Sequence, residues 1–569
     1  MISSAVNTRA FRLASVAVAI VTAYSPSALG INAFFGSVGD AIRQYARQPH
    51  GHYTTAPGTP FLGQHPGRDP HGRGGIWKAW NAKTLKKSGG HHTVALSYQA
   101  PEHTLSVAAE PGPAFPWEGS ASTESASINT GNGNVLTALN LVGWKSRGMN
   151  IDFTLYHNSE TSYSDELAAG WTWTYDIYIN NLSGNPIVHW GDGLCIPYTA
   201  PGGGGGGGGG DDFEALHGPR ASEMTGTTYT PPAGIYDQLV QNTGGTWTLT
   251  KKNGTQYQFN TSGFCNSIVD TNGNTITLTL NSSNYCTKVT DPTGKYLTIN
   301  LSGSNKFTSI VDPLGRTWSF TQSGGELTNV AWPSLSGTVY SDEYTYNSGN
   351  DILTYTDKRG EVWSRSWNSD GSIAVASDPL SHETSYSYSS SATTITDPLS
   401  HVRTDNYSSG LLSSSQDESG YSYSFTSYDS NNNVLAEVDK NSDTWNYTWD
   451  SMGNKLTETD PLSHDTQYTY DSCGNNLTVV DPLGHTIKTN TFDSYGEVLT
   501  SKDALSNTTD FSWDSNGNCV TVTDPLSNVT SIGVDSLNRV VSVTDPLSHE
   551  EQTAFDNWGR VVTLTHQRV

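Results

Sequence analysis

Hydrophobic and polar residues alternate in short runs through most of the chain, and the runs recur at a nearly constant interval. In one such stretch, Tyr468 and Tyr470 alternate with polar residues, and Leu477 and Val479 do the same after a short polar turn. Alternation with a period of two places these side chains on one face of a β-strand. The pattern therefore predicts a hairpin of two short strands.

Two kinds of turn separate the predicted strands. In the first, D-S-C-G-N, Asp471 can cap the turn amides, and Gly474 or Asn475 can take a positive φ. In the second, D-P-L-G, proline fixes φ at the second position and Asp481 accepts hydrogen bonds from the chain ahead. Two strands and two turns account for one unit of about 21 residues.

The same unit recurs along the chain in two phased columns of aspartates. The spacing within a column stays between 19 and 22 residues, apart from a gap around Trp332 where the phase is blurred. One hairpin alone is unstable in water, so we expect stacked hairpins that bury their apolar columns against neighbours. We assign as structural turn residues Asp291, Asp312, Asp378, Asp397, Asp460, Asp481, Asp524 and Asp545 in the Asp-Pro column, and Asp450, Asp471, Asp514 and Asp556 in the aromatic-Asp column.

Composition supports an all-β protein. Charged residues make up only 15% of the chain and aromatics 10%, while Asn, Thr, Ser and Gly dominate the polar positions. The net charge is −24, and the excess of acidic residues lies beyond residue 125, in the part that we call the body. Residues 1–125 contain 10 Lys/Arg and 6 Asp/Glu, whereas the body contains 20 Lys/Arg and 48 Asp/Glu. An acidic surface repels phosphate backbones and anionic lipids, so nucleic-acid binding through the body is disfavoured and no nucleic-acid partner is expected.

The part of the chain before the repeats divides by composition. Residues 1–30 predict an export signal, because Arg9 and Arg12 precede an apolar run of eleven residues that is too short to span a bilayer. Residues 31–125 are rich in Gly, Pro, His and Ser and predict a flexible leader. Nine glycines within 201–212 predict a flexible linker or loop.

The repeat of about twenty residues, with an aromatic-Asp, a Gly-Asn and an Asp-Pro-Leu-Gly turn, resembles the RHS, or YD, repeat family of large bacterial surface and secreted proteins. The resemblance covers the predicted array at 255–569. The strand-rich segment 126–200, with INTGNGNVLTALNLVG and GWTWTYDIYINN, resembles the region that precedes the repeats in that family, and 213–254 is a strand-rich lead-in. The resemblance implies a continuous spiral β-sheet forming at least part of a hollow shell, which in several members encloses a C-terminal toxin.

One part of the family pattern is missing. Neither the terminal core with its self-cleavage motif nor a toxin is visible before Val569. We therefore expect a fragment, an incomplete product or a short member whose partner lies elsewhere. About fourteen repeats are expected to form a partial shell.

Candidate chemistry is sparse, and no cofactor or metal is expected. The five cysteines lack CxxC spacing, and Cys265 and Cys286 lie one repeat apart, roughly 9.5 Å, which exceeds disulfide reach. A histidine column follows the Asp-Pro-Leu turns, but asparagine fills the same position elsewhere, so it is interpreted as a polar turn position. The column contains His382, His401, His464, His485 and His549. Calcium on the aspartates is disfavoured, because each turn offers one carboxylate that already caps amides.

No catalytic motif is present, so the leading hypothesis is a non-enzymatic, exported RHS-repeat scaffold, secreted or at the cell surface. It would encase or present a toxin or effector missing from this chain. The alternative is an extracellular adhesin that binds carbohydrate or a cell-surface protein, with Trp445, Trp513 and Trp558 as stacking candidates. A polysaccharide-acting enzyme on a solenoid would need an acidic cluster that the sequence lacks.

Overall fold

The computed structural model describes residues 125–567, apart from 145, 160–165, 181, 183, 202–225, 336, 410, 537–538 and 556–560. The predicted export signal and the glycines of the predicted linker lie outside the described residues, as does the leader up to Glu124. In the described part there is no helix, and hence none that is long and apolar enough to cross a bilayer.

Three antiparallel sheets contain all the strands of the described residues. The first sheet has the order β1 (Ser125–Ile128), β2 (Val135–Trp144), β3 (Ile151–Asn158) and β4 (Trp171–Trp173). The second has the order β5 (Tyr178–Asn180), β6 (Ile187–His189) and β7 (Cys195–Pro197). Both come from the segment that precedes the repeats.

The third sheet contains 33 strands in chain order, and each is antiparallel to the next. Its strands are β8 (Gly226–Tyr229), β9 (Gln238–Asn242), β10 (Trp247–Thr250), β11 (Gln256–Phe259), β12 (Cys265–Val269), β13 (Thr275–Leu280), β14 (Cys286–Thr290), β15 (Tyr296–Leu301), β16 (Phe307–Val311), β17 (Thr317–Ser323), β18 (Glu326–Ala331), β19 (Ser341–Tyr346), β20 (Ile352–Thr356), β21 (Val362–Trp367), β22 (Ile373–Ser377), β23 (Glu383–Tyr388), β24 (Ala392–Thr396), β25 (Val402–Ser408), β26 (Leu411–Gln416), β27 (Ser422–Tyr428), β28 (Val434–Val438), β29 (Thr444–Trp449), β30 (Lys455–Thr459), β31 (Asp465–Tyr470), β32 (Asn476–Val480), β33 (Thr486–Phe492), β34 (Val498–Asp503), β35 (Thr508–Trp513), β36 (Cys519–Thr523), β37 (Val529–Val534), β38 (Val540–Thr544), β39 (Glu550–Phe555) and β40 (Val561–Gln567).

This sheet is open. β8 pairs with β9 and β40 pairs with β39, and within the described residues no pairing joins β40 to β8. The predicted all-β fold with one continuous sheet of hairpins is confirmed. The sheet also includes β8, β9 and β10, which precede the start of the repeats seen in the sequence.

A β-bulge recurs on one side of this sheet and gives it its curvature. In the hairpin of β31 and β32, Thr469 pairs with Thr478, but Tyr470 pairs with Asn476, so one residue of β32 is left over next to the aromatic-Asp turn. The same shift stands beside the equivalent turn in most hairpins of the array. A bulge bends the strand and increases its right-handed twist. Repetition of the bulge on the same side therefore winds the sheet.

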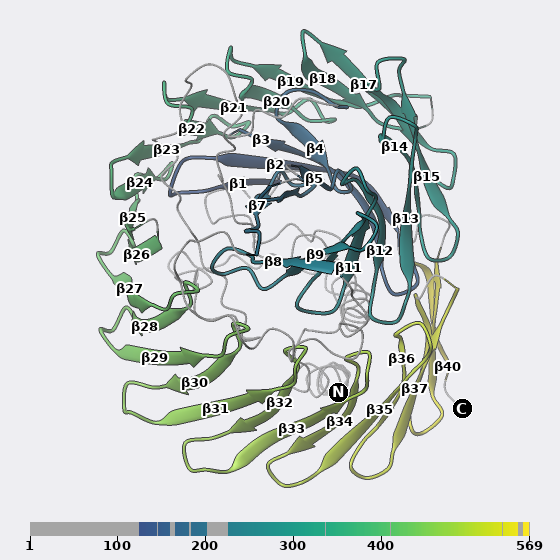
Figure 1. Cartoon of the computed structure of the whole chain (residues 1–569), viewed down its shortest axis with the longest axis vertical. Coiled ribbons are helices and arrows are strands. Elements are labelled where there is room, and N and C mark those ends of the chain that lie inside the picture. Colours follow the sequence, from purple (N-terminus) through teal and green to yellow (C-terminus); the bar gives the residue numbers. More distant parts are fainter. Residues whose placement is uncertain are drawn as a thin grey trace, which may run out of the picture.

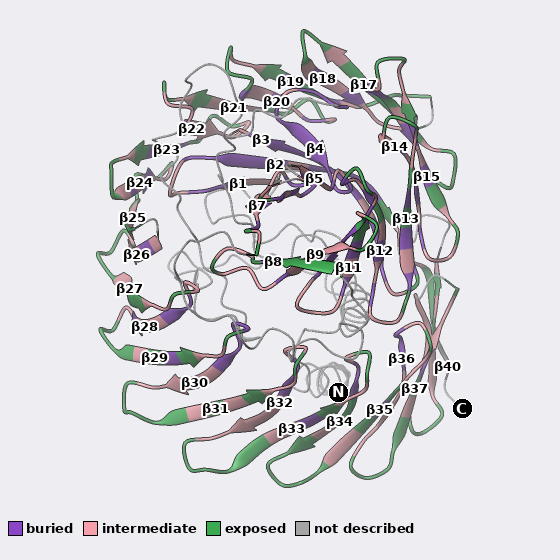
Figure 2. Cartoon of the chain, in the orientation of Figure 1, coloured by how far each residue is buried: buried purple, intermediate pink, exposed green. Residues whose placement is uncertain are grey.

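Figure 1 shows the result, a coiled wall that surrounds the first two sheets. The aromatic-Asp turns between β29 and β37 lie toward the middle of the coil, and we call all turns in this phase the inner turns. The Asp-Pro turns lie at the outer margin, and we call them the outer turns. Figure 2 shows the inner ends of these strands as buried and the outer ends as exposed.

The hydrophobic core is concentrated where the early repeats pack on the first two sheets. Phe153, Trp171, Trp173 and Trp247 are all fully buried in one cluster that continues through the strands up to β20. Later strands have small separate clusters, such as that of Val498 with its neighbours. The early part of the array therefore has a thick core, and the later part is a single-layered wall.

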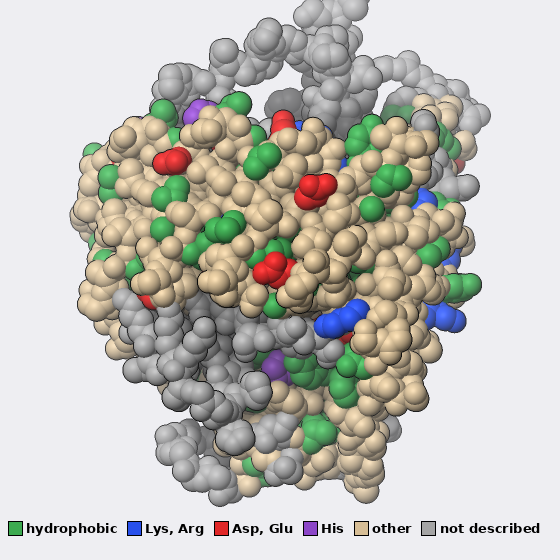
Figure 3. Space-filling view, turned by 90° about the horizontal axis from the view of Figure 1, so that it is seen from above, with side chains coloured by type: hydrophobic (Ala, Val, Ile, Leu, Met, Phe, Trp, Pro, Cys, Tyr) green, Lys and Arg blue, Asp and Glu red, His purple; other side chains and the backbone are tan. Residues whose placement is uncertain are grey.

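One face of the molecule is polar but weakly charged. Seen from above, the surface is mostly uncharged, with hydrophobic side chains scattered singly among a few acidic and basic ones (Figure 3). Isolated apolar side chains of this kind are normal on a protein surface.

Candidate functional site

The inner turn 471–475 is closed by its first side chain. Asp471 Oδ1 accepts hydrogen bonds from the backbone N–H groups of Cys473 and Asn475, both at 2.9 Å, and Oδ2 accepts from Asn475 Nδ2 at 2.9 Å. Gly474 has a φ of 82°, which glycine adopts without strain. One carboxylate thus satisfies three donors, and its oxygens are occupied by the turn itself.

The outer turn 481–485 has the same geometry. Asp481 Oδ1 accepts from the N–H groups of Leu483 at 2.9 Å and His485 at 2.8 Å, and Oδ2 lies 3.1 Å from His485 Nδ1. Where asparagine replaces the histidine, Asn528 Nδ2 donates to Asp524 Oδ2 at 2.8 Å. Histidine and asparagine can replace each other at this position, because each places a side-chain nitrogen against the second carboxylate oxygen.

Each assigned turn aspartate that the structure describes accepts from the backbone N–H groups two and four residues ahead. The outer set is Asp291, Asp312, Asp378, Asp397, Asp460, Asp481, Asp524 and Asp545. The inner set is Asp450, Asp471 and Asp514. Asp556 lies outside the described residues. These aspartates line the two rims and do not converge on one point.

Hydrogen bonds within the turn lower the pKa of Asp481 and Asp524, two of the outer carboxylates. The backbone N–H of His485 is the largest cause that lowers the pKa of Asp481, and the His485 side chain and the N–H of Leu483 add to it. In Asp524 the side-chain amide of Asn528 is the largest cause of a lowered pKa. Hydrogen bonds to the charged form stabilise it, so the turn bonds persist below the usual titration range of aspartate.

We call the part of the sheet that begins at β8 the first winding and the part from β27 onward the later winding. Inner turns of the later winding rest on outer turns of the first winding. Asn272 Nδ2 donates to Glu497 Oε1 at 3.0 Å, and Thr271 Oγ1 donates to the Tyr495 carbonyl at 2.9 Å. Further back along both windings, Asn433 Nδ2 donates to the Tyr236 hydroxyl at 3.0 Å. The contacting residues are separated by about two hundred positions in the sequence, so successive windings of one sheet lie in direct contact.

The earlier inner turns rest on the segment that precedes the array. Ile179 N–H donates to the Gly263 carbonyl at 2.7 Å, and Phe307 N–H donates to the Glu166 carbonyl at 2.8 Å. Farther along, Ile373 N–H donates to the Gly133 carbonyl at 3.1 Å. These are backbone contacts, so they hold the coil together independently of side-chain identity.

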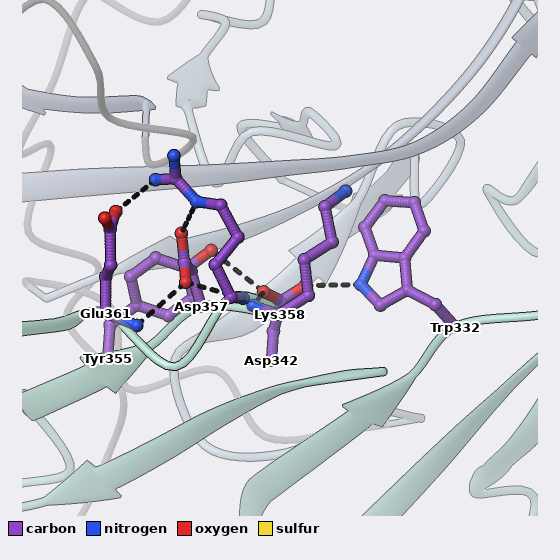
Figure 4. Close-up of polar contacts among 7 residues, drawn as sticks. Trp332, Asp342, Tyr355, Asp357, Lys358 and Glu361 are labelled. Atoms are coloured by element: carbon purple, nitrogen blue, oxygen red, sulfur yellow. Dashed lines mark hydrogen bonds and ion pairs between the residues drawn. The ribbon is translucent and has the colours of Figure 1, made fainter. Parts of the chain in front are cut away.

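The gap in the repeat pattern marks a polar cluster that the sequence did not assign. Asp342 is buried and accepts from Trp332 Nε1 at 2.5 Å, from the Tyr355 hydroxyl at 3.0 Å and from the Lys358 N–H at 3.1 Å (Figure 4). The Lys358 ammonium lies 3.7 Å from the centre of the Trp332 ring. The only signal in the sequence is the blurred phase around Trp332.

Burial and hydrogen bonding oppose each other in this cluster. Burial raises the pKa of Asp342 above its usual value, although the bonds from Trp332 and Tyr355 act against it. The neighbouring Asp357 has a lowered pKa, because bonds from the Arg359 guanidinium and backbone amides outweigh its burial. Both carboxylate oxygens of Asp342 accept hydrogen bonds. The cluster therefore links the segments on either side of the interruption in the repeat.

Other reactive groups are held in neutral forms. Burial raises the pKa of the Cys195 thiol to about 12 and lowers the pKa of its neighbour His189 to about 4, although Sγ and Nδ1 lie 3.1 Å apart. A neutral thiol is a poor nucleophile. Cys265 and Cys286 are free and buried. Among the described residues no group of three or more His, Cys, Asp or Glu is placed to hold a metal ion.

The tryptophans considered for sugar stacking are part of the wall or outside the described residues. Trp513 Nε1 donates to the Val498 carbonyl at 2.8 Å, and both Trp445 and Trp513 are half-buried. Trp558 lies outside the described residues. The two described rings pack against small hydrophobic clusters of the wall, as strand aromatics commonly do.

Comparison with solved structures finds low overall similarity. TcdB2-TccC3 without its hypervariable C-terminal region is 11% identical with a TM-score of 0.39, over 76% of this chain and 24% of that one. TcdB2-TccC3 is 10% identical with a TM-score of 0.39, over 78% and 25%. The Photorhabdus luminescens Tc holotoxin pore with a mutated TccC3 is 10% identical with a TM-score of 0.36, over 76% and 26%. The chain spans about a quarter of the length of these solved chains. No curated protein matches the chain.

Comparison with protein families gives one match, the RHS Repeat family, at residues 428–465 and 492–529. The two matched segments contain the inner and outer turns of the later winding, with the capping carboxylates described above. The resemblance of the array to the RHS family is thereby confirmed, and residues 428–465 and 492–529 of this chain are RHS repeats.

Proposed function

We propose that the chain is an exported, non-enzymatic scaffold whose coiled wall encloses or presents a toxin or effector module. The observation that carries this proposal is the contact between windings, in which inner turns rest on earlier backbone. A sheet that coils on itself in this way forms a self-supporting wall, and a container requires such a wall.

The chemistry of the wall supports a structural role. The turn carboxylates are occupied by turn donors, and the buried thiols and the His189 imidazole are held neutral. Acid-base or nucleophilic catalysis needs groups whose pKa is tuned toward the working pH and that converge on a substrate. The turn carboxylates are instead distributed evenly along two rims.

Enclosure can be tested with a reporter domain. A small, protease-sensitive domain inserted in the inner turn 514–518 should be digested more slowly than the free domain, because the wall restricts access to it. The same domain inserted in the outer turn 397–401, which lies at the outer margin of the coil, should be digested at the free rate. Equal digestion of the two insertions would contradict enclosure.

Export is tested separately. Residues 1–30 fused to a reporter enzyme should direct it out of the bacterial cytoplasm, whereas Leu13→Arg together with Val16→Arg should retain it, because charges interrupt the apolar run. Retention of the unaltered fusion would contradict export without affecting the enclosure proposal.

A further inference from the structure

The outer turns of the later winding carry a regular row of exposed apolar side chains. Five successive turns between β30 and β39 each expose a leucine, and each leucine follows an exposed proline or alanine. We call this row the leucine rim. Its leucines are Leu462, Leu483, Leu505, Leu526 and Leu547, exposed by 76%, 81%, 82%, 81% and 73%. The residues before them are Pro461, Pro482, Ala504, Pro525 and Pro546.

Folding of the turn does not require these leucines. Each leucine is the third residue of its turn, counted from the aspartate. Its backbone N–H donates to the turn aspartate, and the turn makes no use of its side chain. Other outer turns have Asn272, Ser419 or Asn441 at the same position and keep a capping aspartate. A row of exposed leucines without a local structural role is typical of an interaction surface.

The leucine rim is regular. Equivalent turns lie two strand spacings apart, so neighbouring leucines are separated by roughly 9.5 Å and the rim extends over roughly 40 Å. Figure 1 shows these turns as one arc along the outer margin of the coil, and Figure 2 shows the margin as exposed. The arc has Leu505 at its centre, with two leucines on either side.

We propose that the leucine rim binds the leucine rim of a second copy of this chain. A two-fold axis through the centre of the arc maps the rim onto itself, because the repeats are evenly spaced. Leu505 then meets its own counterpart, Leu462 meets Leu547, and Leu483 meets Leu526. A closed two-fold interface of this kind is the commonest arrangement in soluble oligomers.

The exposed leucines supply part of the apolar area that a dimer interface needs. Burial energies of a leucine side chain correspond to roughly 100 Å² of apolar surface, so the five leucines offer about 400 Å² per copy at their observed exposure. This is about half of the roughly 800 Å² per partner of a standard interface, and the adjoining prolines and turn atoms add to it.

Two other occupants fit less well. Where an outer turn is covered by another winding, the third residue is polar and pairs with a polar group, as Asn272 does with Glu497. A lipid surface would favour Lys or Arg beside the leucines, but each turn of the rim has an aspartate and no Lys or Arg. The carboxylates of facing rims repel each other, and salt screens this repulsion, so the dimer should strengthen with salt.

The first test is the mass of the full chain in solution. At about 10 μM, above the micromolar Kd of the weaker standard-size interfaces, sedimentation should give twice the 61.3 kDa chain mass. A variant with all five rim leucines changed to Asn, the residue at 441, should sediment at half the wild-type mass with an unchanged Tm. A matched control, Leu499→Thr on an exposed strand face, should remain dimeric.

The second test locates the axis by oxidative crosslinking. Leu505→Cys should give a disulfide-linked dimer, whereas Leu462→Cys alone should not, because it faces Leu547. A mixture of Leu462→Cys and Leu547→Cys chains should restore the crosslink. A monomeric wild-type chain, a dimer that survives the five-leucine change, or flotation of monomers with phosphatidylcholine vesicles would overturn the proposal.

Discussion

The inner and outer turns share one local design but have different surroundings. Gly263 lies in an inner turn and Gly484 in an outer turn, and both have a φ of 83°. A Cβ at Gly263 would lie 2.3 Å from the Ile179 carbonyl oxygen, whereas a Cβ at Gly484 would meet nothing within 4 Å. The same turn motif therefore has two different roles. The inner turns hold the coil together, whereas the outer turns of the later winding face solvent.

The glycine pair gives the largest expected difference. Gly484→Ala should destabilise the protein by about 1 kcal/mol, from backbone strain alone. Gly263→Ala has the same strain and must also displace the Ile179 carbonyl, so we expect a loss of about 3 kcal/mol. Urea unfolding followed by circular dichroism measures both. Equal losses would show that contact with β5 does not stabilise the inner turn.

Removal of the capping carboxylate should give a smaller difference in stability between inner and outer turns than the glycine pair does. Asp481→Ala should cost about 1 kcal/mol, because water can replace the lost bonds at an exposed turn. Asp471→Ala should cost about 2 kcal/mol, because Asn475 is buried and its amide loses its acceptor. Thermal unfolding of the two variants measures the two losses of stability. A larger loss in Asp481→Ala than in Asp471→Ala would contradict the prediction.

The contact between windings should give the protein a pH dependence. Burial is the largest cause that raises the pKa of Glu497 from 4.5 to about 7. Between these values the folded chain keeps a proton that the unfolded chain has released, so stability falls as pH rises from about 4.5 to 7. Glu497→Gln should flatten this part of the stability profile. An unchanged slope in that variant would place the responsible group elsewhere.

The smallest expected effect belongs to the outer rim. Leu483→Asn should change the free energy of unfolding by less than about 0.5 kcal/mol when measured at a concentration where the chain is monomeric. Met452 holds the same position in an inner turn and is only 6% exposed, so Met452→Asn should cost about 2 kcal/mol or more. A substantial loss in Leu483→Asn would mean that the rim leucines have a folding role.

The sequence predicts the hairpin and its turns well because their causes are local. The alternation of Tyr468 and Tyr470 and the turn chemistry after Asp471 act within a few residues. Contacts between windings cannot be predicted in this way, because they depend on curvature that accumulates over many bulged hairpins. Nothing in the sequence near Asn272 indicates that it meets Glu497.

The same reasoning explains what the sequence missed in the candidate site. The sequence pattern predicts the same role for Asp471 and Asp481, and both do cap a turn in the same way. Their difference lies in what covers the turn. The Asp342 cluster was signalled only by a break in the repeat, because its partners come from different strands and the connecting segments.

Hydrogen exchange tests the difference between the rims most directly. Amides of the inner turn 471–475 and the outer turn 481–485 have the same turn bonds, so intrinsic turn stability cannot separate them. Because the inner turn lies against the first winding, its amides should exchange at least about tenfold more slowly, following the local opening free energy. Equal exchange in the two turns would contradict the claim that the coil is held together by its inner turns.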